Sequence, residues 1–233
     1  LFNSMLDKLP GIQLKLVIID GEDFPAKINP GSFVICRRET NGTDYSIPLP
    51  MSLPEEIFNR ISSYKDNPKS YSIGFLGSVG KHSERRYTLI EEIASYYPDS
   101  LLQAAPVSET EGKHPDERVG LDSYYDNLQR CRAVLTLRGA GYDTLRFWEN
   151  AACNALHVSE TMPLFIPDDF EDKRDIIRFS DIDQLRKVID SHLSGSEETD
   201  QIIKSSNQHL KNYHLTTKRA IYFLDRIKRA FDN

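Results

Sequence analysis

Short apolar runs alternate with amphipathic helical patterns over residues 71–158, and this alternation restricts the fold more than any other feature of the sequence. Strands are expected at 71–76, 100–104, 133–137 and 155–158. Helices are expected between them at 84–97, after Asp122 as its cap, and at 143–153. Such a series predicts an α/β fold, a Rossmann-like parallel sheet with helices on both faces. Ligands of these sheets bind outside the carboxyl ends of the strands.

The flanking regions follow a different pattern. Apolar runs at 14–19 and 32–36 predict two more strands, and a proline-marked connection leads to a helix at 55–64. We therefore expect a partial N-terminal α/β segment with its linker at 1–68 and a Rossmann-like domain with closing helices at 69–233. Three helices are expected to close the chain, beginning at the capping box Ser180–Asp183, at Ser196 and at Thr216.

Composition narrows the classes of partner. The 29 basic and 35 acidic residues are mixed along the chain, so we expect no nucleic-acid partner. No apolar run approaches the ~18 residues of a membrane span, and residues 1–10 lack the layout of a signal peptide. The separated cysteines Cys36, Cys131 and Cys153 predict reduced thiols and a cytoplasmic protein.

No metal site is expected, because Cys-x-x-Cys and His-x-x-x-His spacings are missing from the sequence. The acidic clusters at 20–23 and 168–172 are interpreted as turn and cap residues. A divalent metal at Asp20–Asp23 stays open as an alternative.

Two glycine-containing loops are expected to open at the same edge of the sheet, at 77–83 and at 138–144. The second joins a strand to a helix that Asp143 or Thr144 can cap. Unpaired N–H groups and the helix dipole attract an anion to such a junction, and Arg138 and Arg146 add full charges there.

The loop at 77–83 falls short of a phosphate-binding P-loop, because Phe75 replaces its first glycine and His82 follows Lys81. A nucleoside triphosphatase is therefore excluded. The alternative for this loop is a tight turn that needs positive φ at Gly77 or Gly80.

The loop at 138–144 keeps a dinucleotide alternative open. Gly139 and Gly141 fit that fingerprint, Thr144 replaces its third glycine, and Glu160 lies where an acid for the ribose is expected. Two arginines favour a detachable diphosphate over a dinucleotide. Arg146 and Glu149 could also form an ordinary i,i+3 surface ion pair.

Several segments carry a resemblance to a known family. They are Tyr124, Cys131–Glu149, Ile166–Phe170, Ile177–Leu185 and Tyr213–Ala220. From about residue 71 to 228 the chain resembles GT-B glycosyltransferases, in particular the group-1-like bacterial family related to CgeB, with a more distant likeness to exostosins.

The resemblance implies a glycosyltransferase of glycan biosynthesis whose C-terminal domain binds a nucleotide-diphosphate sugar. The acceptor, a glycan, a lipid or a protein, would be held by an N-terminal domain, and no cofactor would be required. The implied diphosphate ligands are Arg138 and Arg146, with close backbone approach at Gly139, Gly141 and Thr144. Glu149 would bind the ribose, and Gly77, Ser78 and Arg85 would close the cleft. The catalytic residue is not assigned. An NAD(P)-binding enzyme and a non-catalytic nucleotide-binding or interaction module remain the alternatives.

Overall fold

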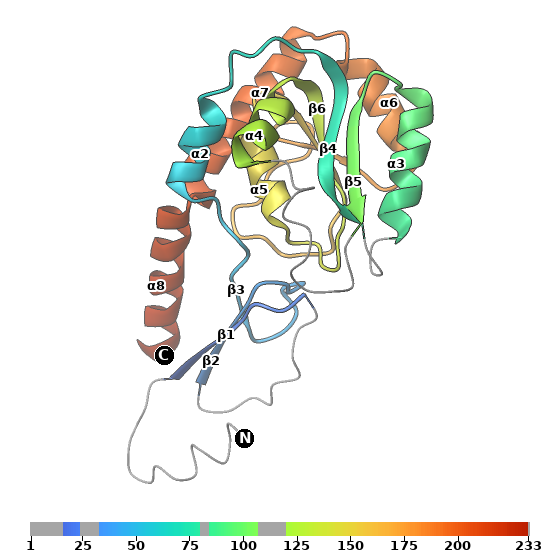
Figure 1. Ribbon diagram of the computed structural model, residues 1–233. Coiled ribbons are helices and arrows are strands. Elements are labelled where there is room, and N and C mark those ends of the chain that lie inside the picture. The colour runs from blue at the N-terminus through green and yellow to red at the C-terminus, as the bar shows by residue number, and fades with distance from the viewer. Residues whose placement is uncertain (1–15, 24–32, 80–83, 107–119, 233) are drawn as a thin grey trace.

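The structure, a computed structural model, describes residues 16–23, 33–79, 84–106 and 120–232, and these form two parallel sheets (Figure 1). The smaller sheet has the order β1-β2-β3 and the larger one the order β5-β4-β6-β7-β8. The strands of the smaller sheet are β1 (Leu16–Asp20), β2 (Phe33–Arg37) and β3 (Ile47–Pro48). Those of the larger sheet are β4 (Tyr71–Val79), β5 (Leu101–Pro106), β6 (Cys131–Thr136), β7 (Leu156–Glu160) and β8 (Ile177–Phe179).

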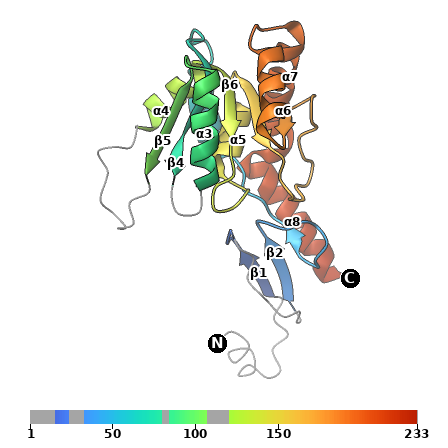
Figure 2. The ribbon, with the colours of Figure 1, turned by 90° about the vertical axis from the view of Figure 1, so that its right-hand side faces the viewer.

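Helices cover both faces of the larger sheet, which confirms the predicted Rossmann-like architecture. One face carries α3 (Glu84–Tyr96) and α6 (Ile182–His192), and the other carries α4 (Leu121–Gln129) and α5 (Leu145–Ala152) (Figures 1 and 2). Successive side chains of a strand point to opposite faces. In β6, Ala133 and Leu135 therefore join the core under α3, whereas Val134 joins the core under α5.

The strand order places a topological switch point between β4 and β6. From β4 the chain runs through α3 to β5 on one side, and it returns through α4 to β6 on the other side. At such a point the connecting loops diverge and leave a crevice at the carboxyl ends of the two strands. Leu76 and Gly77 of β4 and the turn that follows β6 lie at this edge.

One loop prediction was wrong. Gly77, Ser78 and Val79 continue β4 and pair with residues 104–106 of β5, so Gly77 is extended and needs no positive φ. The pairing partner compensates for the weak strand propensity of Gly and Ser. Residues 80–83, with Gly80, Lys81 and His82, lie outside the described residues.

Two helix starts also differ from the prediction. Gly120, not Asp122, is the N-cap of α4, and Asp122 instead accepts a hydrogen bond from Arg60 Nε (2.7 Å). The cap of α6 is Asp181 in place of Ser180: its carboxylate accepts from Gln184 N (2.8 Å). The helix start is thus capped one residue later than predicted, and Gln184 accepts from Ser180 N (2.9 Å). Asp and Ser are about equally favoured at the cap position.

The last helices begin where expected. They are α7 (Glu197–His209), capped by Ser196, and α8 (Thr216–Asp232). A π-helical turn, η1 (Leu210–His214), joins them and was not predicted. Within the described residues, no helix is both long and apolar enough to cross a membrane. All three cysteines are buried free thiols, as expected.

The connection from β3 to the next helix runs beside the junction between η1 and α8, where Leu53 and Leu215 form a parallel bridge. Leu53 N donates to His214 O (3.1 Å) and Thr216 N donates to Leu53 O (3.0 Å). The next helix, α2 (Glu55–Ser62), buries Phe58 and Ile61 in the core of the larger sheet. The predicted boundary after residue 68 stays a prediction.

Candidate functional site

The turn that follows β6 lies at the switch point and leads into α5. It closes on itself through a hydrogen bond from Gly139 N to Gly141 O (3.0 Å). Its second half is held from outside, since Glu39 Oε1 accepts from Tyr142 N (2.7 Å) and Asp143 N (2.8 Å). The turn is therefore fixed by its own backbone and by a residue of the segment that follows β2.

The start of α5 has no side-chain cap, so the prediction of a cap by Asp143 or Thr144 was wrong. Thr144 occupies the N-cap position, but its hydroxyl makes no capping bond. The carboxylate of Asp143 accepts instead from Met51 N (2.7 Å) and Trp148 Nε1 (2.9 Å). Within the described residues, the N–H groups of Leu145 and Arg146 have no acceptor. Such N–H groups at a helix start form an anion site.

Arg146 extends from this helix start across the end of β4. Its Nε donates to Leu76 O (3.0 Å), and its Cζ lies 4.7 Å from the centre of the Phe75 ring. A Cβ on Gly77 would lie 2.6 Å from Arg146 Nη2. The structure thus brings Gly77 and Arg146 together, and the glycine leaves room for the guanidinium.

Arg138 and Arg85 are connected through Glu160. Arg138 N donates to Glu160 Oε2 (2.5 Å), and Arg85 Nη1 pairs with Glu160 Oε1. The Arg138 side chain is exposed and lies over the Tyr142 ring, with Cζ 4.5 Å from the ring centre. Glu160, the acid that a dinucleotide site would use on the ribose, is thus engaged with protein groups.

Arg86 holds the start of the turn by hydrogen bonds to its backbone carbonyl groups, a role that was not predicted from the sequence. Its side chain is buried, and it donates to Leu137 O and Arg138 O, both at 3.0 Å. Burial, with the nearby charge of Arg146, lowers its pKa to about 10. A Cβ on Gly139 would lie 2.8 Å from Arg86 Nη2, which accounts for the glycine. The only signal in the sequence was the pair Arg85–Arg86, which does not show which arginine faces inward.

Glu149 lies one turn further along α5 and has its own partners. Tyr124 Oη donates to one carboxylate oxygen (3.0 Å) and Tyr125 Oη to the other (2.9 Å). Burial and the Glu149 charge raise the pKa of both tyrosines. For Tyr124 the charge of Arg146 opposes this rise, but the pKa is still raised. Arg146 and Glu149 therefore have separate partners, since Arg146 donates to Leu76 O and Glu149 accepts from the two tyrosines. The Ser78 side chain lies outside the described part of the chain.

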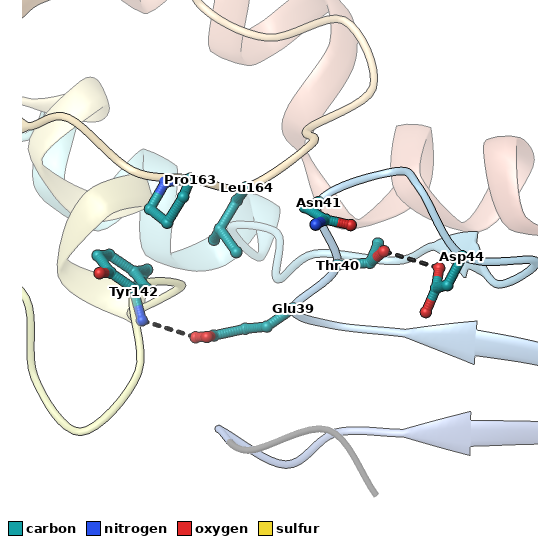
Figure 3. A pocket seen from close by; sticks show the side chains of 7 residues that line it. All are labelled: Glu39, Thr40, Asn41, Asp44, Tyr142, Pro163 and Leu164. Atoms are coloured by element: carbon teal, nitrogen blue, oxygen red, sulfur yellow. Dashed lines mark hydrogen bonds between the residues drawn. The ribbon is translucent and has the colours of Figure 1, made fainter. Parts of the chain in front are cut away.

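A pocket of about 300 Å³ lies beside this contact, between Tyr142, the segment 39–44 that follows β2, and Pro163 with Leu164 (Figure 3). Its lining combines carboxylates, an amide and the Tyr142 ring, from Glu39, Thr40, Asn41, Asp44, Tyr142, Pro163 and Leu164. Glu39 and Tyr142 belong both to the pocket and to the contacts of the turn. No periodicity or motif in the sequence sets Glu39 apart.

The acidic clusters are engaged with protein groups. Asp20 lies 3.9 Å from Arg37, and Asp23 pairs with Arg38. In the second cluster, Asp169 pairs with Arg178 (2.8 Å). Among the residues that the structure describes, no group of three or more His, Cys, Asp or Glu side chains could hold a metal ion.

Known structures show the same fold. A glycosyltransferase from Rickettsia africae ESF-5 superposes with a TM-score of 0.52 at 8% identity, over 86% of this chain and 64% of that protein. An alpha-glucosyltransferase solved in complex with UDP-glucose and DNA containing an abasic site gives a TM-score of 0.56 at 12% identity, over 97% of this chain and 75% of that one. This chain thus spans about two thirds of the length of the Rickettsia protein. These likenesses establish a GT-B glycosyltransferase fold.

A comparison with curated proteins finds no match. The family model described as glycosyl transferase-like matches residues 81–225, more than half of the 233 residues. That match begins ahead of α3 and ends within α8, so it includes the switch-point turn and α5. The chain therefore belongs to the glycosyl transferase-like family.

Proposed function

We propose that the chain binds a nucleotide-diphosphate sugar at the switch-point turn, for transfer of the sugar to an acceptor. The observation that carries this proposal is the uncapped start of α5 with the Arg146 guanidinium beside it. Two charges of a diphosphate match unpaired helix N–H groups and a fixed guanidinium. Arg138, exposed on the same turn, supplies a second cation.

The other predicted residues have complementary roles in this proposal. Gly77 and Gly139 leave room for Arg146 and Arg86, and Thr144 is the N-cap residue beside which the backbone approaches the phosphates. Glu149 accepts from the ribose hydroxyls while Tyr124 and Tyr125 hold its carboxylate. Ser78 and Arg85 belong to the edge that closes the cleft.

The chemistry follows from the charge on the leaving group. An acceptor heteroatom forms the new bond to the anomeric carbon, the bond from that carbon to the diphosphate oxygen breaks, and the acceptor proton goes to a base. The electron pair of the broken bond stays on the diphosphate. Arginines and helix N–H groups that face this oxygen stabilise the developing charge.

The proposal requires no metal ion. Arg37 and Arg38 pair with Asp20 and Asp23, so these carboxylates already have cationic partners. The acceptor, a glycan, a lipid or a protein, belongs to the same proposal, as do a place in glycan biosynthesis and a cytoplasmic site of action. The buried thiols fit a reducing compartment.

The experiment is a thermal-shift panel of UDP, GDP, ADP, UDP-glucose and NAD, each with and without EDTA. UDP comes first because the alpha-glucosyltransferase of similar fold holds UDP-glucose. We expect one nucleoside diphosphate and its sugar conjugates to raise Tm, with EDTA making no difference. Stabilisation by NAD alone, or by no nucleotide at all, would contradict the proposal.

A further inference from the structure

The switch-point turn is held by a carboxylate that comes from a distant part of the chain. Glu39 follows β2, and its Oε1 accepts from Tyr142 N, 103 residues away (Figure 3). The same oxygen accepts from the neighbouring Asp143 N. Both bonds are short, at 2.7 and 2.8 Å. Charge-assisted bonds of this kind are about twice as strong as neutral ones.

The carboxylate fits closely against the turn. The Glu39 side chain is only 6% exposed, and a Cβ placed on Gly141 would overlap its Oε1 atom. Arg38 Nη2 lies 4.0 Å from the same oxygen. Burial raises the pKa of Glu39, and the bonds from Asp143 N and Tyr142 N oppose that rise. Glu39 is thus a buried carboxylate that packs against Gly141 and accepts two backbone N–H groups of the turn.

We propose that Glu39 is a positioning residue, whose carboxylate holds the switch-point turn in the shape that receives a diphosphate. This inference rests on the proposed function, since it assumes that the ligand binds at the start of α5. Glu39 acts through the turn: it takes the N–H groups of Tyr142 and Asp143. Those of Leu145 and Arg146 are left for the ligand. Donor affinity then depends on a residue of the segment between β2 and β3.

The first test needs no ligand. Hydrogen exchange of the peptide 138–147 is measured by mass spectrometry in wild type, E39A, E39Q and the exposed control E22A. We expect exchange in E39A to be about tenfold faster or more, because two amides lose their acceptor. E39Q keeps an acceptor oxygen but loses the charge, so its exchange should lie between those of wild type and E39A. Exchange in E39A at the wild-type rate would overturn the proposal.

The second test measures two dissociation constants for the same four proteins, together with Tm. The probes are inorganic pyrophosphate and whichever of UDP, GDP and ADP stabilises the wild type most. We expect about tenfold weaker binding by E39A at a temperature well below its Tm, with E39Q and E22A within about threefold of wild type. A lower Tm with unchanged affinity would show that Glu39 is only structural. If wild type binds neither probe, the proposed function fails, while the exchange result still judges the contact itself.

A third variant covers the case in which E39A does not fold. G141A adds one methyl group against the Glu39 carboxylate, and also against that of Asp23, and leaves both carboxylates in place. We expect it to accelerate exchange in the turn and to weaken pyrophosphate binding, as E39A does. Wild-type exchange and affinity in G141A would contradict a close contact between Glu39 and the turn.

Discussion

At the switch point, three glycines matter for the space that they leave beside charged side chains. Gly77, Gly139 and Gly141 each lie against a charged side chain, namely Arg146, Arg86 and Glu39. None of the three has a positive φ. Each glycine is therefore needed because a Cβ would meet that neighbour, and its conformational freedom is not required.

Gly77→Ala tests this reading at one residue. The added Cβ would lie 2.6 Å from Arg146 Nη2 and 3.0 Å from the Phe75 ring, so the guanidinium must move. We expect roughly tenfold weaker binding of the stabilising nucleoside diphosphate, with little change in Tm, because the flexible end of Arg146 gives way. Calorimetric titration measures the affinity. An affinity equal to that of wild type would show that the position of Arg146 is not used.

At the scale of elements, the uncapped start of α5 is held by hydrogen bonds from the Asp143 carboxylate to groups outside the first turn of the helix. Asp143 gives its two oxygens to Met51 N and Trp148 Nε1, which ties the connection at 49–54 to α5. Asp143 thus orients α5 while the N–H groups of Leu145 and Arg146 keep no acceptor among the residues that the structure describes.

Asp143→Ala should therefore destabilise the fold. It leaves two donors without an acceptor, the Met51 amide and the buried Trp148 indole, at a cost of about 1–3 kcal/mol each. We expect the free energy of unfolding in urea to fall by roughly 2–4 kcal/mol. Asp122→Ala removes an exposed ion pair to Arg60 and should leave the free energy of unfolding close to that of wild type. Equal stability of the two variants would refute this role for Asp143.

The fold of the larger sheet could be predicted because buried parallel strands are continuous apolar runs, as at 133–137, and the helices between them have a clear period. The exact helix starts were harder to predict, because neighbouring residues can serve equally well as the N-cap. Ser180 and Asp181 are both good caps, and only the position of Gln184 selects the second. Glu39 and Arg86 could not be found, since their roles depend on contacts 51 to 104 residues away along the chain.

At the scale of the whole molecule, two buried histidines make stability depend on pH. His157 and His214 are at most 1% exposed, and burial lowers the pKa of each to about 3. The charge of Arg178 adds to the shift of His157. The charges of Arg219 and His209 add to that of His214, and Asp175 opposes it.

The unfolded chain binds protons at these histidines near pH 6.5, whereas the folded chain does not. Stability is therefore full above about pH 6.5 and falls as the pH drops towards about 3. Between pH 7 and pH 5 we expect a loss of roughly 2 kcal/mol per histidine in urea unfolding at constant ionic strength. His157→Leu should remove about half of this dependence. An unchanged pH slope in that variant would contradict the assignment.

The central claim is that the start of α5 and Arg146 hold a diphosphate, and calorimetric titration of Arg146→Ala tests it most directly. The titrant is whichever of UDP, GDP and ADP stabilises the wild type most. The matched control is Arg132→Ala, which removes an exposed arginine at the opposite end of β6. We expect the dissociation constant to rise about 10- to 100-fold in Arg146→Ala, the loss of a charge-assisted bond, and to stay unchanged in Arg132→Ala. Wild-type affinity in Arg146→Ala would contradict the account.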